Sequence, residues 1–596
     1  MVTIMTISEK LAALREKMRR NRIDMYYIPT DDFHGSEYVG GYFKCREYIS
    51  GFTGSAGSVV ITQNYAGLWT DGRYYIQAEK QLAGTEYVLN KAGSEGVPSV
   101  TEFILKNIDG GILGFDGRVV SAEMAEKLAD ELCYNHIKAN VDLIGDIWSD
   151  RPPLSTEKAY VLDEKYAGES AASKIKRIRE MMKQKKADIF LLTSPDDICW
   201  LLNIRGNDID YNPVVLSYLE ISDDMIMLFA DKSKLSDEVI TALDKVDVDI
   251  YPYDDFYRRI SGIPEGVRVY LDNSRINYAV KSALPKNLSI INGQNLTLLP
   301  KAIKNSTETE NIIKAHIKDG VAVTKFIYEI KNHPEKYTEL SAAKLIIDLR
   351  SKQEHYIEES FEPITAYGAH AAIVHYTADE ASDVQLKADG FFLCDTGGHY
   401  LEGTTDVTRT ICLGNPTDEM KAHYTAVLRG HLALANAKFL YGCRGANLDI
   451  LARGPLWEQC LNYNHGTGHG VGYTLNVHEG PNGIRWKIPD NASKECIFEE
   501  GMVTSDEPGL YIEGKYGIRT ENLLLCRNGE KNEYGRFMHF DNLTLVPYDP
   551  DAIAPELLSD SEKKNYNTYQ QRVYDTVSPY LTDDEKAWLK NETRAI

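Results

Sequence analysis

A repeated helix-and-strand pattern in the first half of the chain restricts its fold more than any other feature. Residues 10–30 and 174–194 match without a gap, with Lys174 standing 164 positions after Lys10. The other paired positions are Leu11 with Ile175, Leu14 with Ile178, Arg15 with Arg179, Glu16 with Glu180, Met18 with Met182 and Asp24 with Asp188. Each copy has the apolar spacing of an amphipathic helix, followed by a short strand-like run.

Each of these apolar runs ends near a pair of acids, Asp31-Asp32 in the first copy and Asp196-Asp197 in the second. The ungapped match predicts two similar α/β domains in tandem. The alternative is a chance likeness, because basic amphipathic helices followed by strands are common. The repeat is much longer than the unit of a solenoid protein, so a repeat array is excluded.

The length of 596 residues requires several hydrophobic cores, since domains usually hold about 100–200 residues. The segment Arg151-Pro-Pro-Leu-Ser155 is the expected first linker, because adjacent prolines favour an extended chain. Thr307-Glu-Thr-Glu310 has the pattern of a capping box that opens a helix, and a second helix is expected from about Thr417 to Phe439. We therefore expect domains at residues 1–153, 154–305 and 306–596.

Charge and cysteine content exclude several classes of protein. The formal charge of −22 argues against a nucleic-acid partner, because phosphate binding needs clustered Lys and Arg. We expect no secretory signal and no membrane span, since no apolar run approaches the roughly 18 residues that a membrane helix needs. The nine cysteines are scattered and form no Cys-x-x-Cys pair. These features predict a cytoplasmic protein without a membrane or nucleic-acid partner.

Residues 391–411 have the pattern of a β-hairpin with two carboxylates. An apolar strand from Phe391 ends at Asp395, Gly397-Gly398 is expected to form the turn, and Asp406 begins the returning strand. A hairpin can bring both carboxylates to one face. Because burying an unpaired carboxylate is costly, an acid at the end of an apolar strand favours metal binding.

Three further segments each place one metal-binding side chain. His469 stands among the glycines of residues 466–472, Glu507 precedes a Pro-Gly turn at a strand end, and Glu521 lies within an apolar, strand-like run. With Asp395 and Asp406 they give four carboxylates and one imidazole, which would overcharge one ion but suit two ions about 3.5–4 Å apart. Mostly oxygen ligands favour Mn²⁺ or Mg²⁺ and leave Zn²⁺, Fe²⁺ and Co²⁺ possible.

Taken one at a time, these signals are weak. An Asp in a hairpin is usually a turn residue, and a histidine between glycines is as often a loop residue as a ligand. The glycines at 466–472 form no dinucleotide fingerprint, because Val471 occupies the position of the last Gly. The chain contains neither His-Glu-x-x-His nor Gly-x-Ser-x-Gly. The specific signal is therefore the ordered set of five.

Several motifs surround this set. In the last third of the chain they are Asp395-Thr-Gly-Gly, Gly403-Thr-Thr-Asp-Val-Thr-Arg-Thr, His465-Gly-Thr-Gly-His-Gly-Val-Gly, Asn476-Val-His-Glu-Gly-Pro, Thr504-Ser-Asp-Glu-Pro-Gly and Gly517-Ile-Arg-Thr-Glu-Asn. Upstream they are Ser50-Gly-Phe-Thr-Gly-Ser-Ala-Gly, Trp69-Thr-Asp-Gly-Arg-Tyr and Trp200-Leu-Leu-Asn-Ile-Arg-Gly-Asn-Asp. Together they closely resemble the pita-bread metallopeptidase family, in its cytosolic, three-domain Xaa-Pro aminopeptidase (aminopeptidase P) form.

The resemblance implies an α/β (α+β) chain in which two similar creatinase-N-like domains precede a pita-bread catalytic domain. It implies two Mn²⁺ ions bound by Asp395, Asp406, His469, Glu507 and Glu521. The ions would activate a bridging water for attack on the bond between the N-terminal residue and a proline in second place. Glu507 is the expected proton acceptor.

By the same resemblance, three histidines and one arginine line the site. His478 is expected to bind the substrate carbonyl or to shuttle a proton, and His375 and His465 to flank the proline pocket, with His375 also counted as catalytic. Arg519 is expected to support the metal ligands and is grouped with the substrate-binding residues. The alternative for each histidine is a purely structural, hydrogen-bonded side chain.

Other readings remain open at this point. A prolidase shares the ligand set but prefers dipeptides, and creatinase-like enzymes share the scaffold without the full metal set. A member of a different class would be an inactive pita-bread protein that only binds peptides, but such proteins lose ligands and none is lost here. The resemblance also implies a homodimer formed through the catalytic domains.

Overall fold

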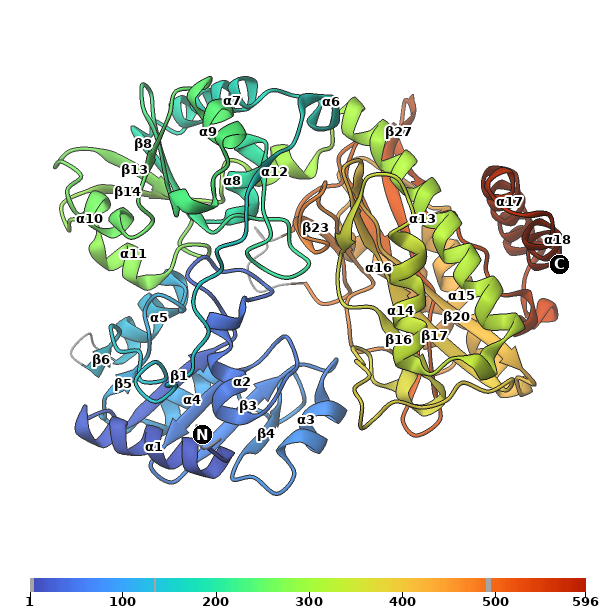
Figure 1. Cartoon of the computed structure of the whole chain (residues 1–596), viewed down its shortest axis with the longest axis horizontal. Helices are drawn as coiled ribbons and strands as arrows, with labels where there is room; N and C mark the ends of the chain where they lie inside the picture. Colours follow the sequence, from blue (N-terminus) through green and yellow to red (C-terminus); the bar gives the residue numbers. More distant parts are fainter. Residues whose placement is uncertain (1–4, 133–135, 489–494) are drawn as a thin grey trace. The chain divides into compact units, whose positions relative to one another are not determined.

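The computed structural model describes residues 5–132, 136–488 and 495–596, and the chain forms two compact units (Figure 1). The N-terminal unit consists of Met1–Leu162 and Glu169–Thr297, and the C-terminal unit consists of Asp163–Gly168 and Leu298–Ile596. Among the helices of the described residues, none combines the length and apolarity needed to cross a membrane.

The predicted repeat is confirmed in the N-terminal unit. Helices α1 (Ile7–Arg20) and α7 (Ala171–Gln184) begin 164 positions apart, as do strands β1 (Met25–Pro29) and β8 (Ile189–Leu192). Leu11, Leu14 and Met18 of α1 are buried, as are the equivalent apolar residues of α7, where Lys174 is buried as well. Each helix therefore lays one apolar stripe on its own sheet.

The likeness between the two halves extends to the whole sheet. The first sheet has the order β4-β3-β2-β1-β5-β6 and the second β12-β11-β10-β8-β13-β14, with antiparallel and parallel pairings in the same sequence. The remaining strands are β2 Ser58–Thr62, β3 Ala66–Thr70, β4 Val88–Lys91, β5 Leu113–Gly114, β6 Ile137–Lys138, β10 Ser217–Ser222, β11 Ile226–Ala230, β12 Val248–Tyr251, β13 Arg268–Leu271 and β14 Ser289–Asn292. Two α/β domains of one topology follow each other in the chain.

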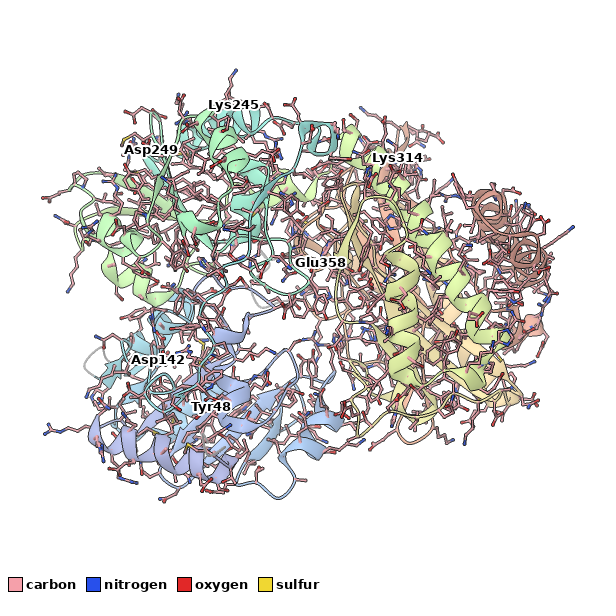
Figure 2. All side chains as sticks on the ribbon, viewed as in Figure 1. Tyr48, Asp142, Lys245, Asp249, Lys314 and Glu358 are labelled. Carbon is pink, nitrogen blue, oxygen red and sulfur yellow. The ribbon has the colours of Figure 1, made fainter. Side chains whose placement is uncertain are left out.

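The predicted linker at 151–155 has no regular secondary structure. Its first residue is held firmly by the preceding domain, because Arg151 Nη1 lies 2.6 Å from Asp142 Oδ2 and its guanidinium packs 3.7 Å from the ring centre of Tyr42. Asp142 is labelled in Figure 2, as is Tyr48, whose ring stacks on Trp148 just before the linker. The domain therefore ends in a packed corner from which the extended chain leaves.

The C-terminal unit is built on two antiparallel sheets, β16-β17-β20 and β21-β28-β27-β24-β22-β23. Its strands include β16 Ile364–Tyr367, β17 Gly390–Thr396, β20 Val407–Gly414, β21 Lys438–Leu440, β22 Gly468–Gly470, β23 Glu479–Ile484, β24 Val503–Asp506, β27 Asn522–Asn532 and β28 Gly535–Asn542. A separate hairpin, β25 (Gly509–Ile512) with β26 (Tyr516–Arg519), lies between β24 and β27 in the chain.

Helices complete this unit: α13 Ser306–Asn332, α14 Glu339–Arg350, α15 Asp418–Ala435, α16 Gly445–Trp457, α17 Asp560–Val577 and α18 Asp583–Glu592. Helices α17 and α18 lie together near the C-terminus (Figure 1). A core of buried side chains joins α15, α17 and β26, among them Tyr424, Val427, Ile518 and Tyr566. The same core contains Phe391 and Cys412, from strands β17 and β20.

Two helix ends differ from prediction. The first helix starts at Ser306 and not at Thr307, because Asn305 caps it: its side chain accepts from the Glu308 amide, and Glu308 Oε2 accepts from the Asn305 amide. The second, α15, begins where expected, at Asp418 after the capping residue Thr417, but ends at Ala435 and not at Phe439. Phe439 belongs to β21, where sheet pairing with β28 replaces the helix.

Candidate metal centre

The first two predicted ligands lie on the β17–β20 pair. Asp395 is the penultimate residue of β17 and pairs with Thr408, and Asp406 immediately precedes β20. The predicted turn at Gly397-Gly398 is wrong, because the chain continues into β18 (Gly398–Tyr400) and returns through β19 (Gly403–Thr404). This extra hairpin pairs with β15 (Tyr356–Glu359), which moves the turn away from the two acids.

The other three predicted ligands lie on or directly beside neighbouring strands of the second sheet. His469 is in the middle of β22, and Glu507 directly follows β24. A Cβ at Gly468 would collide with the carbonyl oxygen of Ser505, so glycine lets β22 approach β24 closely. Glu521 was expected inside a strand but lies in the two-residue break between β26 and β27, where the chain passes from the small hairpin into the sheet.

The structure brings all five residues together. His469 Nε2 lies 3.6 Å from Asp406 Oδ2 and 3.5 Å from Glu507 Oε1. Ligand atoms of Asp406, His469 and Glu521 all lie within 4.8 Å of one another. Asp395 is linked to the group by Arg519, and its carboxylate raises the pKa of Asp406 and of Glu521.

The electrostatics of the group are those of a site built for cations. Burial, and then the neighbouring carboxylates, raise the pKa values of Asp406 and Glu521 well above their ordinary values. Burial also raises the pKa of Glu507 to about 7, against the opposing effect of Arg519. Among the residues that the structure describes, three buried oxygens of this group have no hydrogen-bond partner: Asp395 Oδ1, Asp406 Oδ1 and Glu521 Oε1. Unsatisfied buried carboxylate oxygens are costly, and divalent cations would satisfy them.

Arg519 holds several of these groups in place. Its Nη2 donates to Asp395 Oδ2 at 2.5 Å, and its Nε donates to Thr408 Oγ1 at 3.2 Å. The Thr408 hydroxyl in turn donates to Glu521 Oε2 at 2.7 Å. Arg519 therefore fixes one carboxylate directly and a second through a hydroxyl, while leaving one oxygen of each without a partner.

Tyr511, on β25, is a site residue that the sequence reasoning missed. Its hydroxyl accepts from Arg519 Nη1 at 2.8 Å and lies 2.8 Å from His465 Nε2. Burial raises the pKa of Tyr511 to about 12, so the hydroxyl keeps its proton near neutral pH. The available signal was its place in the β25–β26 hairpin, whose return strand ends at Arg519.

The three predicted histidines lie around the same groups. The ring of His478 is 4.3 Å from that of His469 in an edge-to-face arrangement. His465 contacts Tyr511, and Val374, the residue before the half-buried His375, offers its carbonyl to Arg519 Nη1 at 3.5 Å. These contacts place His478 beside a predicted ligand, join His465 to Arg519 through Tyr511, and join the residue before His375 to Arg519; the roles of all three histidines stay predictions.

The segment that bears His478 is fastened by buried charges. Glu479, the next residue, lies 2.5 Å from Lys304 Nζ and 3.8 Å from Lys301 Nζ. All three side chains are buried. Breaking such a pair is costly because it leaves an uncompensated buried charge, so the start of β23 is strongly held.

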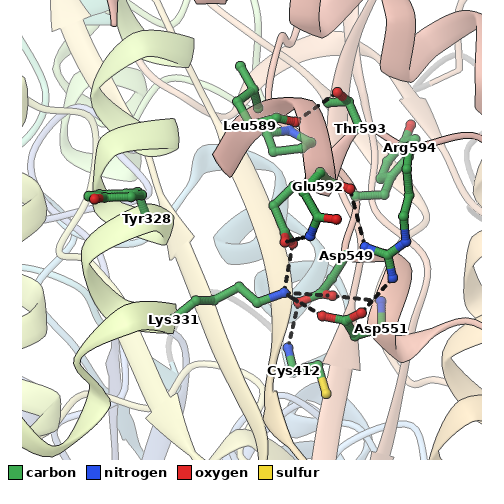
Figure 3. Close-up of polar contacts among 12 residues, drawn as sticks. Tyr328, Lys331, Cys412, Asp549, Asp551, Leu589, Glu592, Thr593 and Arg594 are labelled. Atoms are coloured by element: carbon green, nitrogen blue, oxygen red, sulfur yellow. Dashed lines mark hydrogen bonds and ion pairs between the residues drawn. The ribbon is translucent and has the colours of Figure 1, made fainter. Parts of the chain in front are cut away.

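A second acidic group in the unit already contains its own cation. Asp549, Asp551 and Glu592 come close enough to bind an ion, but Lys331 Nζ lies 3.0, 3.1 and 2.7 Å from them (Figure 3). Arg594 contacts Asp551 at 2.6 Å. We therefore interpret this group as an ion-pair network that joins α13 to the C-terminal helices.

Family models match consecutive parts of the chain. Two models of the creatinase/prolidase N-terminal domain match residues 10–151 and 150–308. The model of metallopeptidase family M24 matches residues 310–528, which include all five candidate ligands, and a model of the C-terminal region of peptidase M24 matches residues 536–596.

Whole proteins match over nearly their full length. The probable Xaa-Pro aminopeptidase P of Laccaria bicolor is 38% identical over 98% of this chain and 93% of its own length. The X-prolyl aminopeptidase of Caenorhabditis elegans, described as a cytosolic enzyme with a di-nuclear active site, has a TM-score of 0.94 at 36% identity, covering 99% of this chain and all of that one. The prolidase of Pyrococcus horikoshii covers only 63% of this chain, with a TM-score of 0.50 at 24% identity, and shares the fold.

The M24 model thus coincides with the part of the chain that gathers four carboxylates and one imidazole, and the full-length relatives extend the match through both preceding domains. The chain belongs to metallopeptidase family M24, as a member with two creatinase/prolidase N-terminal domains.

Proposed function

We propose that this protein is an Xaa-Pro aminopeptidase, which removes the N-terminal residue from peptides with proline in second place. The observation on which the proposal rests is the convergence of five metal-binding side chains around buried, unsatisfied carboxylate oxygens. Relatives with this activity in their names match the chain from end to end.

We further propose two Mn²⁺ ions as the resident metals, held by Asp395, Asp406, His469, Glu507 and Glu521. The oxygen-rich donor set favours Mn²⁺, and the C. elegans relative is described as di-nuclear. When bound, the ions supply an activated water and polarise the scissile carbonyl.

The side chains of this chain divide the remaining work. Glu507, half-buried beside His469, takes the proton of the attacking water and returns it to the leaving nitrogen. His478, whose ring lies next to that of His469, donates a hydrogen bond to the substrate carbonyl or shuttles a proton. Arg519 holds Asp395 in place and orients Tyr511.

Proline recognition is assigned to His375 and His465. A bond to proline is a tertiary amide without an N–H, so the site must hold the ring by shape and cannot read that hydrogen. His465 is fixed through Tyr511, and the backbone beside His375 is fixed through Arg519. The contact of His465 with Tyr511, and that of the Val374 carbonyl with Arg519, support this assignment.

Further properties belong to the same proposal. We propose that its domains are residues 1–153, 154–305 and 306–596. Such an enzyme would be cytoplasmic and would bind peptides, without a nucleic-acid or membrane partner. We also propose a homodimer through the C-terminal unit. Trp457 and Trp486 support it, because their rings meet edge-to-face at 6.1 Å while 39% and 46% of their surfaces remain exposed.

The experiment that tests the activity compares three peptide classes with metal-stripped, Mn²⁺-reloaded protein. We expect Xaa-Pro-Yaa peptides to be cleaved, and Xaa-Ala-Yaa peptides to be cleaved much more slowly. A preference for Xaa-Pro dipeptides would identify a prolidase instead. Equal cleavage of proline and alanine peptides would contradict proline specificity, and peptide binding without hydrolysis would identify an inactive binding protein.

A further inference from the structure

Behind the candidate metal centre, the residues next to two ligands meet in a buried polar chain. Asp506 directly precedes Glu507, and Asn522 directly follows Glu521. Because neighbouring residues in extended chains face opposite ways, the ligands face the metal centre while Asp506 and Asn522 face the interior. The two are direct cross-strand partners on β24 and β27.

A continuous series of contacts connects these two residues through side chains from distant segments. Asn522 Nδ2 donates to the Tyr548 hydroxyl at 3.0 Å. That hydroxyl lies 2.8 Å from His431 Nε2, on α15. His431 Nδ1 lies 3.1 Å from both the carbonyl oxygen and the carboxylate Oδ2 of Asp506.

Beyond Asn522, the series of contacts ends at the positively charged side chain of Arg409. Arg409, on β20 three residues after Asp406, donates from Nη2 to Asn522 Oδ1 at 2.8 Å and from Nη1 to the Glu521 carbonyl at 2.5 Å. The series thus touches all three strands that border Asp406, Glu507 and Glu521. Its five side chains are at most 2% exposed, so none exchanges its partner for water.

With a neutral imidazole at His431, each hydrogen bond of the series has one direction. A carbonyl oxygen can only accept, so a neutral His431 donates from Nδ1 to the Asp506 carbonyl oxygen and accepts at Nε2 from the Tyr548 hydroxyl, whose oxygen accepts from Asn522 Nδ2. Burial raises the pKa of Tyr548 well above its ordinary value, which keeps this proton in place. All donors point from Arg409 toward Asp506, an arrangement in which neighbouring bonds polarise one another.

We propose that Arg409, Asn522, Tyr548, His431 and Asp506 form one positioning relay that sets the spacing of Glu507 and Glu521. This inference rests on the proposed metal centre. The relay ties the ends of β24 and β27 to each other and to β20, so the ligands are already in place when the ions bind. Groups that orient metal ligands from behind are typically worth about 10–100-fold in metal affinity or activity.

The sharpest test is Tyr548→Phe, which removes one hydroxyl and nothing else. Tyr566→Phe is its matched control, because Tyr566 is equally buried in the same core, stacks on Tyr548 and accepts from Gln570 Nε2 at 3.0 Å. Gln570 is bonded to the backbone of Tyr548, so the control leaves the Tyr548 hydroxyl and its partners unchanged. Chelator competition on the Mn²⁺-loaded, full-length protein gives the Mn²⁺ affinity of each variant. We expect Tyr548→Phe to weaken Mn²⁺ binding about 10–100-fold and to lower kcat more than it raises KM, whereas Tyr566→Phe leaves both unchanged.

A double-mutant cycle tests whether the contacts act as one series. The amide of His431→Asn can replace the Nδ1 donor to Asp506 but offers no acceptor to Tyr548, so it breaks the same link from the other side. If the contacts form one series, the second substitution has nothing left to break. The double variant should then bind Mn²⁺ as tightly as whichever single variant has the lower Mn²⁺ affinity.

Equal Mn²⁺ affinity in Tyr548→Phe and Tyr566→Phe, or full additivity in the double variant, would overturn the relay. Because Mn²⁺ affinity is measured without peptide, its loss in Tyr548→Phe supports the relay even if no peptide is cleaved. Failure of the parent protein to bind Mn²⁺ would overturn the metal centre and the relay together.

Discussion

At the scale of single residues, the candidate metal centre is a group of buried acids whose mutual repulsion bound cations would relieve. Burial and like charge raise the pKa values of Asp406 and Glu521, and hydrogen bonds satisfy only part of their oxygens. Such an arrangement is unfavourable for the fold and favourable for the site. Function and stability are therefore opposed at these residues.

Asp406→Asn should abolish peptide hydrolysis and reduce the bound metal to fewer than two ions per chain. Loss of a residue that only supports a metal ligand typically lowers metal affinity or activity about 10–100-fold, so loss of a direct ligand should lower activity by more than about 100-fold. The melting temperature of the metal-stripped variant should be unchanged or higher than that of the metal-stripped parent protein, since one buried charge is removed. Elemental analysis, a peptide assay and thermal unfolding measure the three effects.

The control for this substitution is Asp389→Asn, which changes an exposed acid before β17 and should alter none of the three measurements. Two bound ions and normal turnover in Asp406→Asn would show that Asp406 is not a ligand.

His465→Ala should lower kcat/KM for Xaa-Pro peptides about 10- to 200-fold, the range expected for one pocket contact, with both metals still bound. Tyr511→Phe removes only the hydroxyl that joins His465 to Arg519 and should give part of the same loss. Steady-state kinetics and metal analysis of both variants measure this. Loss of metal in His465→Ala would instead identify a ligand or its support, and unchanged kinetics would identify a structural histidine.

At the scale of elements, ion pairs hold the two C-terminal helices to the rest of their unit. Lys331, on α13, contacts Asp549 and Asp551 and reaches Glu592 at the end of α18 (Figure 3). Its side chain is only 11% exposed, so water screens the network weakly. One lysine therefore joins three segments of the unit.

Lys331→Met should destabilise the protein by about 3–5 kcal/mol, because removing one partner leaves buried acids without compensation. Lys590→Met, an exposed change of the same type on α18, is the control and should have little effect. Thermal and denaturant unfolding measure both, and equal stability of the two variants would contradict the role of the network.

The deficit of Lys331→Met should shrink as the pH falls. Burial already raises the pKa of Glu592, against the opposing effect of Lys331, so without the lysine it rises further. A group with a raised pKa in the folded state binds protons on folding, and its protonated form adds stability that is lost as pH rises through that pKa. Unfolding measured between pH 5 and 8 should therefore show the largest deficit at pH 8.

At the scale of the whole molecule, the open question is assembly. We expect light scattering to give twice the mass of one chain at micromolar concentration. Trp486→Glu should shift the protein toward monomer, because it places a charge on the exposed tryptophan pair. Tyr580→Glu, at another highly exposed ring of the same unit, should leave the dimer intact. A parent protein with the mass of one chain would refute the dimer.

Two kinds of information in the sequence determined most of what could be predicted. The repeat predicted two domains of one fold, because equivalent apolar positions at helical spacing bury the same stripe in each copy. The ligand motifs predicted the metal centre, because their chemistry depends on residue type and order, and both are visible in the chain. Local signals also located the start of α15 at Asp418.

Tertiary structure alone decided the rest. Overlapping capping patterns at Asn305 and Thr307 are equivalent in sequence, and only the packed chain selects Asn305. The turn beyond Asp395 moved because β18 and β19 found a partner in β15, forty residues away in sequence. Tyr511 and the relay behind Glu507 could not be read from motifs, since Arg409, His431, Asp506, Asn522 and Tyr548 meet only when distant strands and a helix pack. The sequence by itself determined which atoms could bind metal, and the tertiary structure decided what holds them in place, because long-range contacts leave no local pattern.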